Sequence, residues 1–276
     1  MKNIVTFNTL GRYGRFANQL FQIAGTIGIA RRNGYSFAFP EWKNYDHAER
    51  FGSQEDIDLQ KYFVNPLPVY NGPVLPDRPV EWGYHDVRLT QSCSLSGHMQ
   101  STRYFEHCLD EVRFFFRMKD EYTLRDKVAV HVRLGDYDNA YHPRLDMRYY
   151  AAAIEQFPKG TQFLVFSDDP DAASDMFVAH FGSDPKGERF QYVKGDTPAT
   201  EYIDCFKLMK ACRHFIIGNS SYSAMAAILG EAPDKQIIAP SPWFGKAWGA
   251  HYRSMEHDIY GTGWTVIDYE KTVSHV

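Results

Sequence analysis

The chain has 276 residues, of which 44% are apolar and 23% charged, a balance typical of globular proteins. Its formal net charge of −4 argues against a nucleic-acid-binding protein, because such proteins carry a basic surplus. No stretch reaches the roughly 18 apolar residues that a membrane-spanning helix needs. The four cysteines form no CxxC pair, which favours reduced thiols. We therefore expect a cytoplasmic protein with no membrane span and no nucleic-acid partner.

The first half of the chain begins with regular structure and then becomes irregular. Residues 4–7 form a short apolar run that predicts a strand, and apolar residues recur at helical spacing from Phe16 to Arg32. Gly34 stands where the C-terminal cap of that helix is expected. The stretch 41–95 is rich in proline, glycine, aspartate and aromatic residues and predicts little regular structure, whereas 103–116 has a helical pattern.

Strand and helix signals alternate through the second half of the chain. The strands are expected at 127–134, 163–169, 190–193, 214–218 and 235–240, and the helices at 146–157, 202–212 and 221–229. Such alternation indicates parallel βαβ units with right-handed crossovers. The change from irregular to regular composition predicts a domain boundary just before Lys127, which divides the chain into domains 1–126 and 127–276.

The segment HVRLGDYD places polar side chains at the end of a predicted strand. His131, Arg133 and Asp136 lie at or just past its carboxyl end, which is the edge where open α/β sheets bind ligands. An arginine at this edge can hold a phosphate through two parallel charged hydrogen bonds. The alternative is an Arg–Asp pair with a purely structural role.

A second candidate anion site follows the strand at 214–218. Asn219, Ser220 and Ser221 begin a predicted helix, where side chains and backbone N–H groups can meet an anion. Ordinary helix capping is the alternative. Asp168, at the end of another strand, would either bind a nucleobase or ribose edge or cap the following helix.

A metal site is not favoured by the distribution of carboxylates. Three D-x-D pairs occur, namely Asp56/Asp58, Asp136/Asp138 and Asp169/Asp171. Such a pair can hold Mg²⁺ or Mn²⁺ against a diphosphate, but its repetition in one chain shows how unspecific the pattern is. Gly11 and Gly14 do not complete a dinucleotide-binding fingerprint. We expect no metal and no other cofactor.

The order and the amino-acid sequences of these segments resemble those of glycosyltransferase family 11, the α-1,2-fucosyltransferases. GRFANQLFQIA is similar to the family's G-G-L-G-N-Q-x-F-Q-Y-A, through Gly14, Asn18, Gln19, Phe21, Gln22 and Ala24. LSGHMQSTRYF, VAVHVRLGDY, FLVFSDD and DCFKLMKACRHFIIGNSSYSAMAAIL are similar to four further blocks, in the family's order. The resemblance spans residues from about 8 to 245.

The chain departs from the family pattern at three positions. Leu134 replaces the second arginine of the H-x-R-R-G-D motif, and Ala224 and Met225 replace paired tryptophans. The related protein O-fucosyltransferases also keep only the first arginine, and GRFANQ is similar to their opening motif as well. These departures bear on the acceptor more than on the reaction type.

The resemblance implies an α/β fold of the GT-B-like class, with two Rossmann-like domains facing across a cleft. Residues 1–126 would be the acceptor side and 127–276 the GDP-sugar-binding domain. The implied reaction is metal-independent transfer of L-fucose from GDP-fucose to a glycan, α-1,2 to galactose, with inversion. Its implied catalytic residues are Arg133, Asn18 and Asp136, and its donor-binding residues are His131, Arg133, Asp168, Asn219, Ser220 and Ser221.

Other functions stay open at the level of sequence. One alternative is a transferase that uses another GDP-sugar or another acceptor. A second is a protein that binds nucleotide sugars without catalysis, and Leu134 and the missing tryptophans would be signs of such a protein. A hydrolase with paired carboxylates from the Asp-rich loops is a further class. The sequence does not identify the general base, because three candidates follow the strand that leads to Arg133, namely Asp136, Asp138 and His142.

Overall fold

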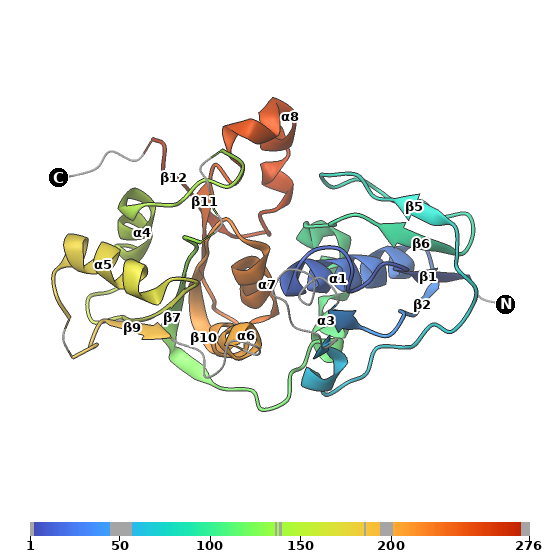
Figure 1. The fold of residues 1–276 in the computed structure, drawn as a ribbon, viewed down its shortest axis with the longest axis horizontal. Helices are drawn as coiled ribbons and strands as arrows, with labels where there is room; N and C mark the ends of the chain where they lie inside the picture. The colour runs from blue at the N-terminus through green and yellow to red at the C-terminus, as the bar shows by residue number, and fades with distance from the viewer. Residues whose placement is uncertain are drawn as a thin grey trace. The chain divides into compact units, whose positions relative to one another are not determined.

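The computed structural model describes residues 3–44, 57–135, 137, 140–184, 186–193 and 201–271 (Figure 1). The chain forms two compact units. The first comprises residues 1–120 and 257–261, and the second comprises residues 121–256 and 262–276. Unit 1 and unit 2 therefore meet in the sequence between Asp120 and Glu121, and a short late segment returns to unit 1.

Unit 1 is built on a four-stranded sheet in the order β2-β1-β6-β5, in which all neighbours are parallel. Its strands are β1 (Ile4–Thr6), β2 (Ser36–Phe37), β5 (Asp77–Pro79) and β6 (Cys93–Ser96). The other elements of this unit are α1 (Phe16–Arg32), β3 (Lys43–Asn44), β4 (Ile57–Asp58), η1 (Gln60–Tyr62), η2 (Thr102–Tyr104), η3 (Glu106–Cys108) and α3 (Leu109–Phe115). The turn η5 (Glu256–Asp258) begins at the last residue of unit 2 and continues into the late segment of unit 1.

Helix α1 is almost completely buried and confirms the helix expected at Phe16–Arg32. It ends at Arg32 and is capped by Asn33, and the following Gly34 has φ +70°, so glycine supplies the left-handed conformation that terminates the helix. Gly28 allows close packing, because a Cβ there would lie 2.0 Å from the Tyr104 carbonyl oxygen. The segment that follows β6 therefore packs directly on the helix backbone.

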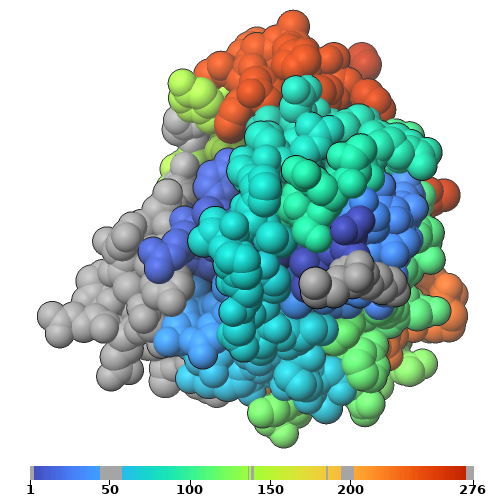
Figure 2. Space-filling view, turned by 90° about the vertical axis from the view of Figure 1, so that its right-hand side faces the viewer, coloured from blue at the N-terminus to red at the C-terminus, as the bar shows by residue number. Residues whose placement is uncertain are grey.

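The stretch between η1 and β6 covers a face of unit 1. Figure 2 shows these cyan and teal residues spread over the surface rather than folded into a layer of their own. Within the described part of the expected irregular stretch 41–95, the regular elements are short, and β5 has three residues. The expected helix at 103–116 is broken into η2, η3 and α3, so it begins with two tight turns before becoming α-helical.

Unit 2 contains a six-stranded parallel sheet in the order β12-β11-β10-β7-β8-β9. Its strands are β7 (Leu124–Val132), β8 (Gln162–Ser167), β9 (Phe190–Val193), β10 (Cys212–Ile216), β11 (Ile237–Ser241) and β12 (Thr265–Asp268). The helices are α4 (Met147–Ile154), α5 (Pro170–Phe181), α6 (Glu201–Ala211), α7 (Ser221–Leu229), η4 (Lys246–Trp248) and α8 (Gly249–Ser254). The expected parallel α/β fold is confirmed.

The strand order of unit 2 is that of a Rossmann fold. Along the chain, β7, β8 and β9 extend the sheet in one direction, and β10, β11 and β12 extend it in the other. The direction reverses between β7 and β10, and open α/β sheets bind ligands outside the carboxyl ends of the strands at such a point. One boundary differs from expectation: Cys212 is not on the helix with Cys205 but begins β10, since α6 ends at Ala211.

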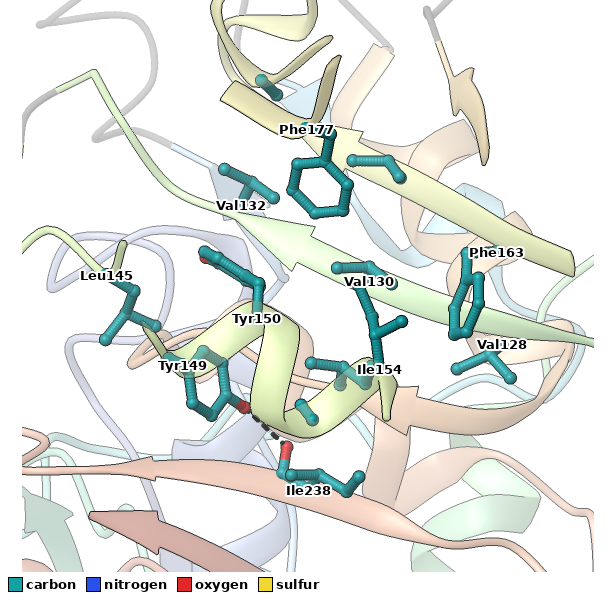
Figure 3. Packing of buried hydrophobic residues seen from close by; sticks show 14 of the residues in the cluster. Val128, Val130, Val132, Leu145, Tyr149, Tyr150, Ile154, Phe163, Phe177 and Ile238 are labelled. Carbon is teal, nitrogen blue, oxygen red and sulfur yellow. Dashed lines mark hydrogen bonds between the residues drawn. The ribbon is translucent and has the colours of Figure 1, made fainter. Parts of the chain in front are cut away.

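The core of unit 2 fixes this carboxyl edge. The end of β7 is buried on both faces, and Figure 3 shows α4 packed against its valines. The Tyr149 hydroxyl donates to the carbonyls of Ile217 (2.6 Å) and Ile238 (3.0 Å), and the Tyr150 hydroxyl donates to that of His131 (3.1 Å). Two adjacent tyrosines of α4 thus connect the end of β7, the residue after β10 and the start of β11.

None of the helices within the described residues combines the length and the apolar character that crossing a membrane requires. All four cysteines lie among these residues and are free thiols, with Cys93 and Cys212 buried.

Candidate functional site

The carboxyl edge of unit 2 brings together the predicted residues of three strands. Arg133 follows β7, Asp168 follows β8, and residues 219–221 follow β10. Because β7 lies between β8 and β10, these residues share the point at which the sheet reverses direction. Their positions follow from strand length and register, since Val132 pairs with Ser167 and Ile216 with Val130.

Asp168 holds the loop that carries Arg133. Its carboxylate lies 3.0 Å from Arg133 Nη1, and both side chains are largely buried. The same carboxylate accepts the backbone N–H groups of Leu134 (2.9 Å) and Gly135 (2.8 Å). Arg133 and Asp168 thus form an Arg–Asp ion pair of the kind named above as the alternative to phosphate binding. The pair fixes the position of the guanidinium at the edge of the sheet.

Gly135 lets the Asp168 carboxylate lie close to the backbone of the β7 loop, where a Cβ would displace that carboxylate. A Cβ on Gly135 would lie 2.5 Å from Asp168 Oδ2. Tyr137 supports the arginine from another side, since the guanidinium carbon lies 5.8 Å from the centre of its ring. The Tyr137 hydroxyl donates to the Asn219 carbonyl at 2.8 Å, which links the β7 loop to the start of α7.

His131 is a buried, neutral link between β7 and α7. Its side chain is 6% exposed, and its Nδ1 lies 2.9 Å from the Ser223 hydroxyl. Burial, together with the nearby Arg133 charge, lowers the pKa of His131 to about 3. The imidazole therefore adds no charge to the site at neutral pH, and its ring lies beside that of Tyr222.

The start of α7 combines helix capping with loop attachment. The Ser220 hydroxyl caps the helix by accepting the Tyr222 N–H at 3.3 Å. The buried Asn219 amide donates to the carbonyls of Pro143 (3.0 Å) and Trp243 (3.2 Å) and so joins two loops to the helix start. Ser221 is the first residue of α7 and is partly buried. The helix N-terminus contributes partial positive charge to this edge.

Two of the acidic candidates, Asp136 and Asp138, lie outside the described residues. The other candidate base, His142, packs its ring against Tyr137, with 5.1 Å between ring centres, and lies near Trp248. Arg144 donates its Nε–H to the Tyr137 carbonyl at 2.7 Å, so it also maintains the loop after β7.

Asn18 lies in unit 1, in the first turns of α1, and accepts a hydrogen bond from the Gln100 amide at 2.7 Å. This bond ties the start of α1 to the segment that follows β6. Gly14, with φ +79°, packs on Asn18, and a Cβ there would lie 2.8 Å from the asparagine Cβ. Gln19 and Gln22 hold the preceding loop by donating to the carbonyls of Gly14 (2.9 Å) and Tyr13 (2.8 Å).

The carboxylates of the D-x-D pairs that can be placed have local structural partners. Asp169 caps α5 by accepting the Ala172 N–H at 3.0 Å, and Asp58 accepts the Gln60 N–H at 3.0 Å. In the described parts of the chain, no group of three or more His, Cys, Asp or Glu side chains is placed to hold a metal ion.

Sequence reasoning missed several residues that shape this edge. Tyr137 and Gly135 belong to the HVRLGDYD motif, where an aromatic residue and a glycine beside an arginine were available signals. The Pro143 and Trp243 carbonyls that Asn219 holds gave no signal, because every residue carries a carbonyl.

Comparisons with known proteins identify the family of the chain. The model of "Glycosyl transferase family 11" matches residues 87–268, which is more than half of the chain. The O-antigen biosynthesis glycosyltransferase WbnK of Escherichia coli is 35% identical over 126 residues, covering 42% of this chain and 38% of WbnK. The alpha-1,2-colitosyltransferase of Escherichia coli is 28% identical over 268 residues, covering 84% of this chain and 90% of that protein.

Solved structures similar to this chain include the fucosyltransferase NodZ from Bradyrhizobium, with 13% identity and a TM-score of 0.47 over 82% of this chain and 92% of NodZ. POFUT1 in complex with GDP-fucose gives 11% identity and a TM-score of 0.46, covering 86% of this chain and 97% of POFUT1. Both are distant likenesses.

Proposed function

Because this chain belongs to glycosyl transferase family 11 and is a glycosyltransferase, we propose that it transfers L-fucose from GDP-fucose to a sugar hydroxyl. The acceptor is a galactose residue, and the new bond is α-1,2 with inversion. The observation that carries the proposal is the Arg133 guanidinium, held by Asp168 at the point where the sheet of unit 2 reverses direction, with α7 starting after the neighbouring strand β10.

The chemistry is an in-line displacement at the anomeric carbon. The acceptor oxygen forms a bond to that carbon, the bond to the diphosphate oxygen breaks, and GDP leaves with the electron pair. The acceptor hydroxyl proton is released during this step. Negative charge grows on the diphosphate, so the enzyme accelerates the reaction most by groups that bind this charge.

Arg133 is the group proposed to bind the leaving diphosphate. Its loop is held by Asp168, so little reorganisation is needed when charge develops. The N-terminus of α7, near Ser220 and Ser221, would add its partial positive charge. His131 and Asn219 support this arrangement through their bonds to α7 and to the neighbouring loops.

Asn18 and Asp136 are the proposed catalytic partners of Arg133. The Asn18 amide would orient the acceptor or the glycosidic oxygen of the donor. Asp136 would orient Arg133 or take part in proton transfer, and we assign no general base. Asp168, proposed from sequence to contact guanine or ribose, has its carboxylate engaged by three N–H groups, which favours a positioning role.

We further propose that transfer needs no metal ion, because a guanidinium and a helix N-terminus together can neutralise the diphosphate. GDP titrated by calorimetry in EDTA should bind with nearly the same affinity as in Mg²⁺. Loss of most binding on chelation would instead indicate a metal site, with Asp136/Asp138 as the first candidate.

The relative named an alpha-1,2-colitosyltransferase supports the α-1,2 linkage and suggests a second donor. Colitose is fucose without the hydroxyl at C3, so one hydroxyl distinguishes the two sugars. A site that hydrogen-bonds this hydroxyl would reject GDP-colitose strongly, whereas an apolar site would accept both. GDP-colitose therefore belongs in the donor screen beside GDP-fucose.

The test supplies GDP-fucose, GDP-colitose, GDP-mannose and UDP-galactose with lactose, N-acetyllactosamine and galactose, and determines the product linkage by NMR. We expect fucose α-1,2-linked to galactose. Transfer from UDP-galactose alone would overturn the donor assignment, and fucose on a different hydroxyl would refute only the linkage. GDP-fucose binding with neither hydrolysis nor transfer would favour a non-catalytic nucleotide-sugar-binding protein, and cleavage of a finished glycan without nucleotide would favour a hydrolase.

A further inference from the structure

Unit 1 contains a pocket of about 200 Å³ that the donor chemistry does not use. Its walls come from the loop after β1 and from the segments that follow β5 and β6. In the sheet order β2-β1-β6-β5, the direction of strand addition reverses between β1 and β6. The pocket therefore lies at the carboxyl edge of unit 1, at the kind of position where parallel sheets bind small molecules.

Three rings form an aromatic wall of this pocket. The ring of His98 lies between those of Tyr13 and Trp82, with centre-to-centre distances of 4.5 Å and 5.1 Å. Tyr13 is 45% exposed, so part of its ring surface is open to a ligand. Such a surface suits a pyranose, because one face of a sugar ring presents C–H bonds and packs on aromatic rings.

Polar groups complete the pocket and can meet hydroxyl groups. The exposed carboxylate of Glu81 accepts hydrogen bonds, and the Gln100 amide is held in place by Asn18. Asp258, from the segment that returns to unit 1, accepts from the Tyr84 N–H and from Arg103, each at 2.9 Å. The Asp258 carboxylate is therefore used to hold the pocket wall together.

The charges of the wall select against anionic ligands. Among the described residues that line the pocket, two carry carboxylates and none is a lysine or arginine. Burial lowers the pKa of His98, so its imidazole is neutral at neutral pH and supplies no positive charge. A uronic acid, a sialic acid or a sugar phosphate would meet only negative or neutral groups here.

We propose that this pocket binds the acceptor as an uncharged hexopyranose, with one ring face against Trp82 and Tyr13 and a hydroxyl donating to Glu81. The role as acceptor site rests on the proposed function, whereas sugar binding itself does not. Saturation-transfer NMR with methyl β-galactoside and with lactose tests the binding on the full chain without any donor.

The test compares three variants with the unmodified chain. Trp82→Ala should reduce the saturation-transfer signal of both sugars about ten-fold, and Trp82→Phe should restore most of it. Phe114→Ala is the matched control, since Phe114 is an exposed aromatic residue of unit 1 outside the pocket and should change nothing. Circular dichroism of each variant shows whether the fold is intact.

Charge selection gives an independent readout at an exposed position. The unmodified chain should bind methyl β-galactoside well and galacturonate about ten-fold more weakly, and Glu81→Lys should narrow or reverse this preference. Equal signals from the unmodified chain and folded Trp82→Ala, or no signal from the unmodified chain, would overturn the proposal. Failure to bind GDP in calorimetry would refute the proposed function instead, so the two failures are distinguishable.

Discussion

The Arg133 guanidinium and the Asp168 carboxylate form an ion pair across the ends of two neighbouring parallel strands, with 3.0 Å between Nη1 and Oδ2. Val132 of β7 pairs with Ser167 of β8, so the arginine and the aspartate are the next residues along each strand. The carboxylate also binds two backbone N–H groups of the arginine's own loop. One side chain thus sets both the direction of the guanidinium and the path of the loop.

Arg133→Ala should nearly abolish transfer while leaving the fold intact. Loss of a group that stabilises the leaving diphosphate should lower kcat by about 10²–10³-fold, as for removed oxyanion donors. Arg133→Lys should recover little, because an ammonium cannot reproduce the fork of the guanidinium. Initial rates with GDP-fucose and lactose give the comparison. Arg213→Ala is the control, since this exposed arginine lies at the opposite end of the sheet; equal losses in both variants would deny Arg133 a special role.

Asp168→Asn and Asp169→Asn make the same change at adjacent positions with different expected results. Asparagine at 168 loses the ion pair and cannot accept all three N–H groups, so kcat should fall by about ten-fold or more. Asparagine at 169 should be nearly neutral, because it caps α5 almost as well as aspartate. Kinetics with varied GDP-fucose also distinguish positioning of Arg133 from direct contact with the nucleotide. An effect confined to the KM for GDP-fucose would indicate that Asp168 contacts the nucleotide directly.

Protein stability should decrease in mild acid partly through His131. The folded protein holds this imidazole neutral with a pKa of about 3, whereas the unfolded chain takes up a proton near pH 6.5. The unfolded state therefore binds more protons as the pH falls from 6.5 towards 3, and stability falls with it. The slope approaches about 1.4 kcal/mol per pH unit, or about 2 kcal/mol between pH 6.5 and 5.

His131→Asn removes this proton uptake, and its amide can still meet the Ser223 hydroxyl. Urea unfolding at pH 7, 6 and 5 should give a shallower pH dependence for the variant than for the unmodified chain. Parallel curves would show that His131 is not held neutral by its burial.

Gly28→Ala should destabilise unit 1 more than Gly25→Ala, although both changes favour the helix by about 1 kcal/mol in propensity. A Cβ at Gly28 meets backbone, 2.0 Å from the Tyr104 carbonyl oxygen, which cannot move without shifting η2. A Cβ at Gly25 would lie 2.9 Å from both the Sδ and the Cβ of Met99. A rotamer change moves the sulfur away, and the contact with the Met99 Cβ is less severe than the 2.0 Å contact at Gly28. We expect Gly28→Ala to lower the free energy of unfolding by at least about 1–3 kcal/mol. Thermal unfolding of the two variants gives the comparison, and equal melting temperatures would contradict the backbone contact.

Elements with strong local signals could be predicted from the sequence. The expected bounds of α1 and α7 agree with the structure from the first residue to the last, because each helix has both an apolar pattern and a clear end signal. Asp146 likewise caps α4, where a helix was expected from that residue. Chain-order alternation of strands and helices also predicted the parallel sheet of unit 2.

Elements whose stability comes from tertiary contacts could not be predicted. Strand β6 (CSLS) alternates apolar and polar residues over only four positions, which is too short a signal to predict a strand. It is nevertheless central in unit 1, and its buried Ser94 hydroxyl accepts the Asn8 N–H at 2.8 Å. Helix α5 buries only Ala173 and Phe177, so its periodicity is weak. The same limit applies to the site: its residues were predicted at strand ends, but the Arg133–Asp168 pairing depends on the register of β7 and β8.

The segment 257–261 has a consequence for the order in which the protein can be made. On the ribosome, the first 120 residues emerge well before Asp258, whose hydrogen-bond partners Arg103 and Tyr84 lie 155 and 174 positions earlier in the chain. Closing so long a loop is entropically costly, and it waits until almost all of unit 2 has been synthesised. In a nascent unit 1, Arg103 and the Tyr84 N–H therefore lack the Asp258 carboxylate and depend on water instead, and a chain interrupted before residue 257 would never gain these two bonds.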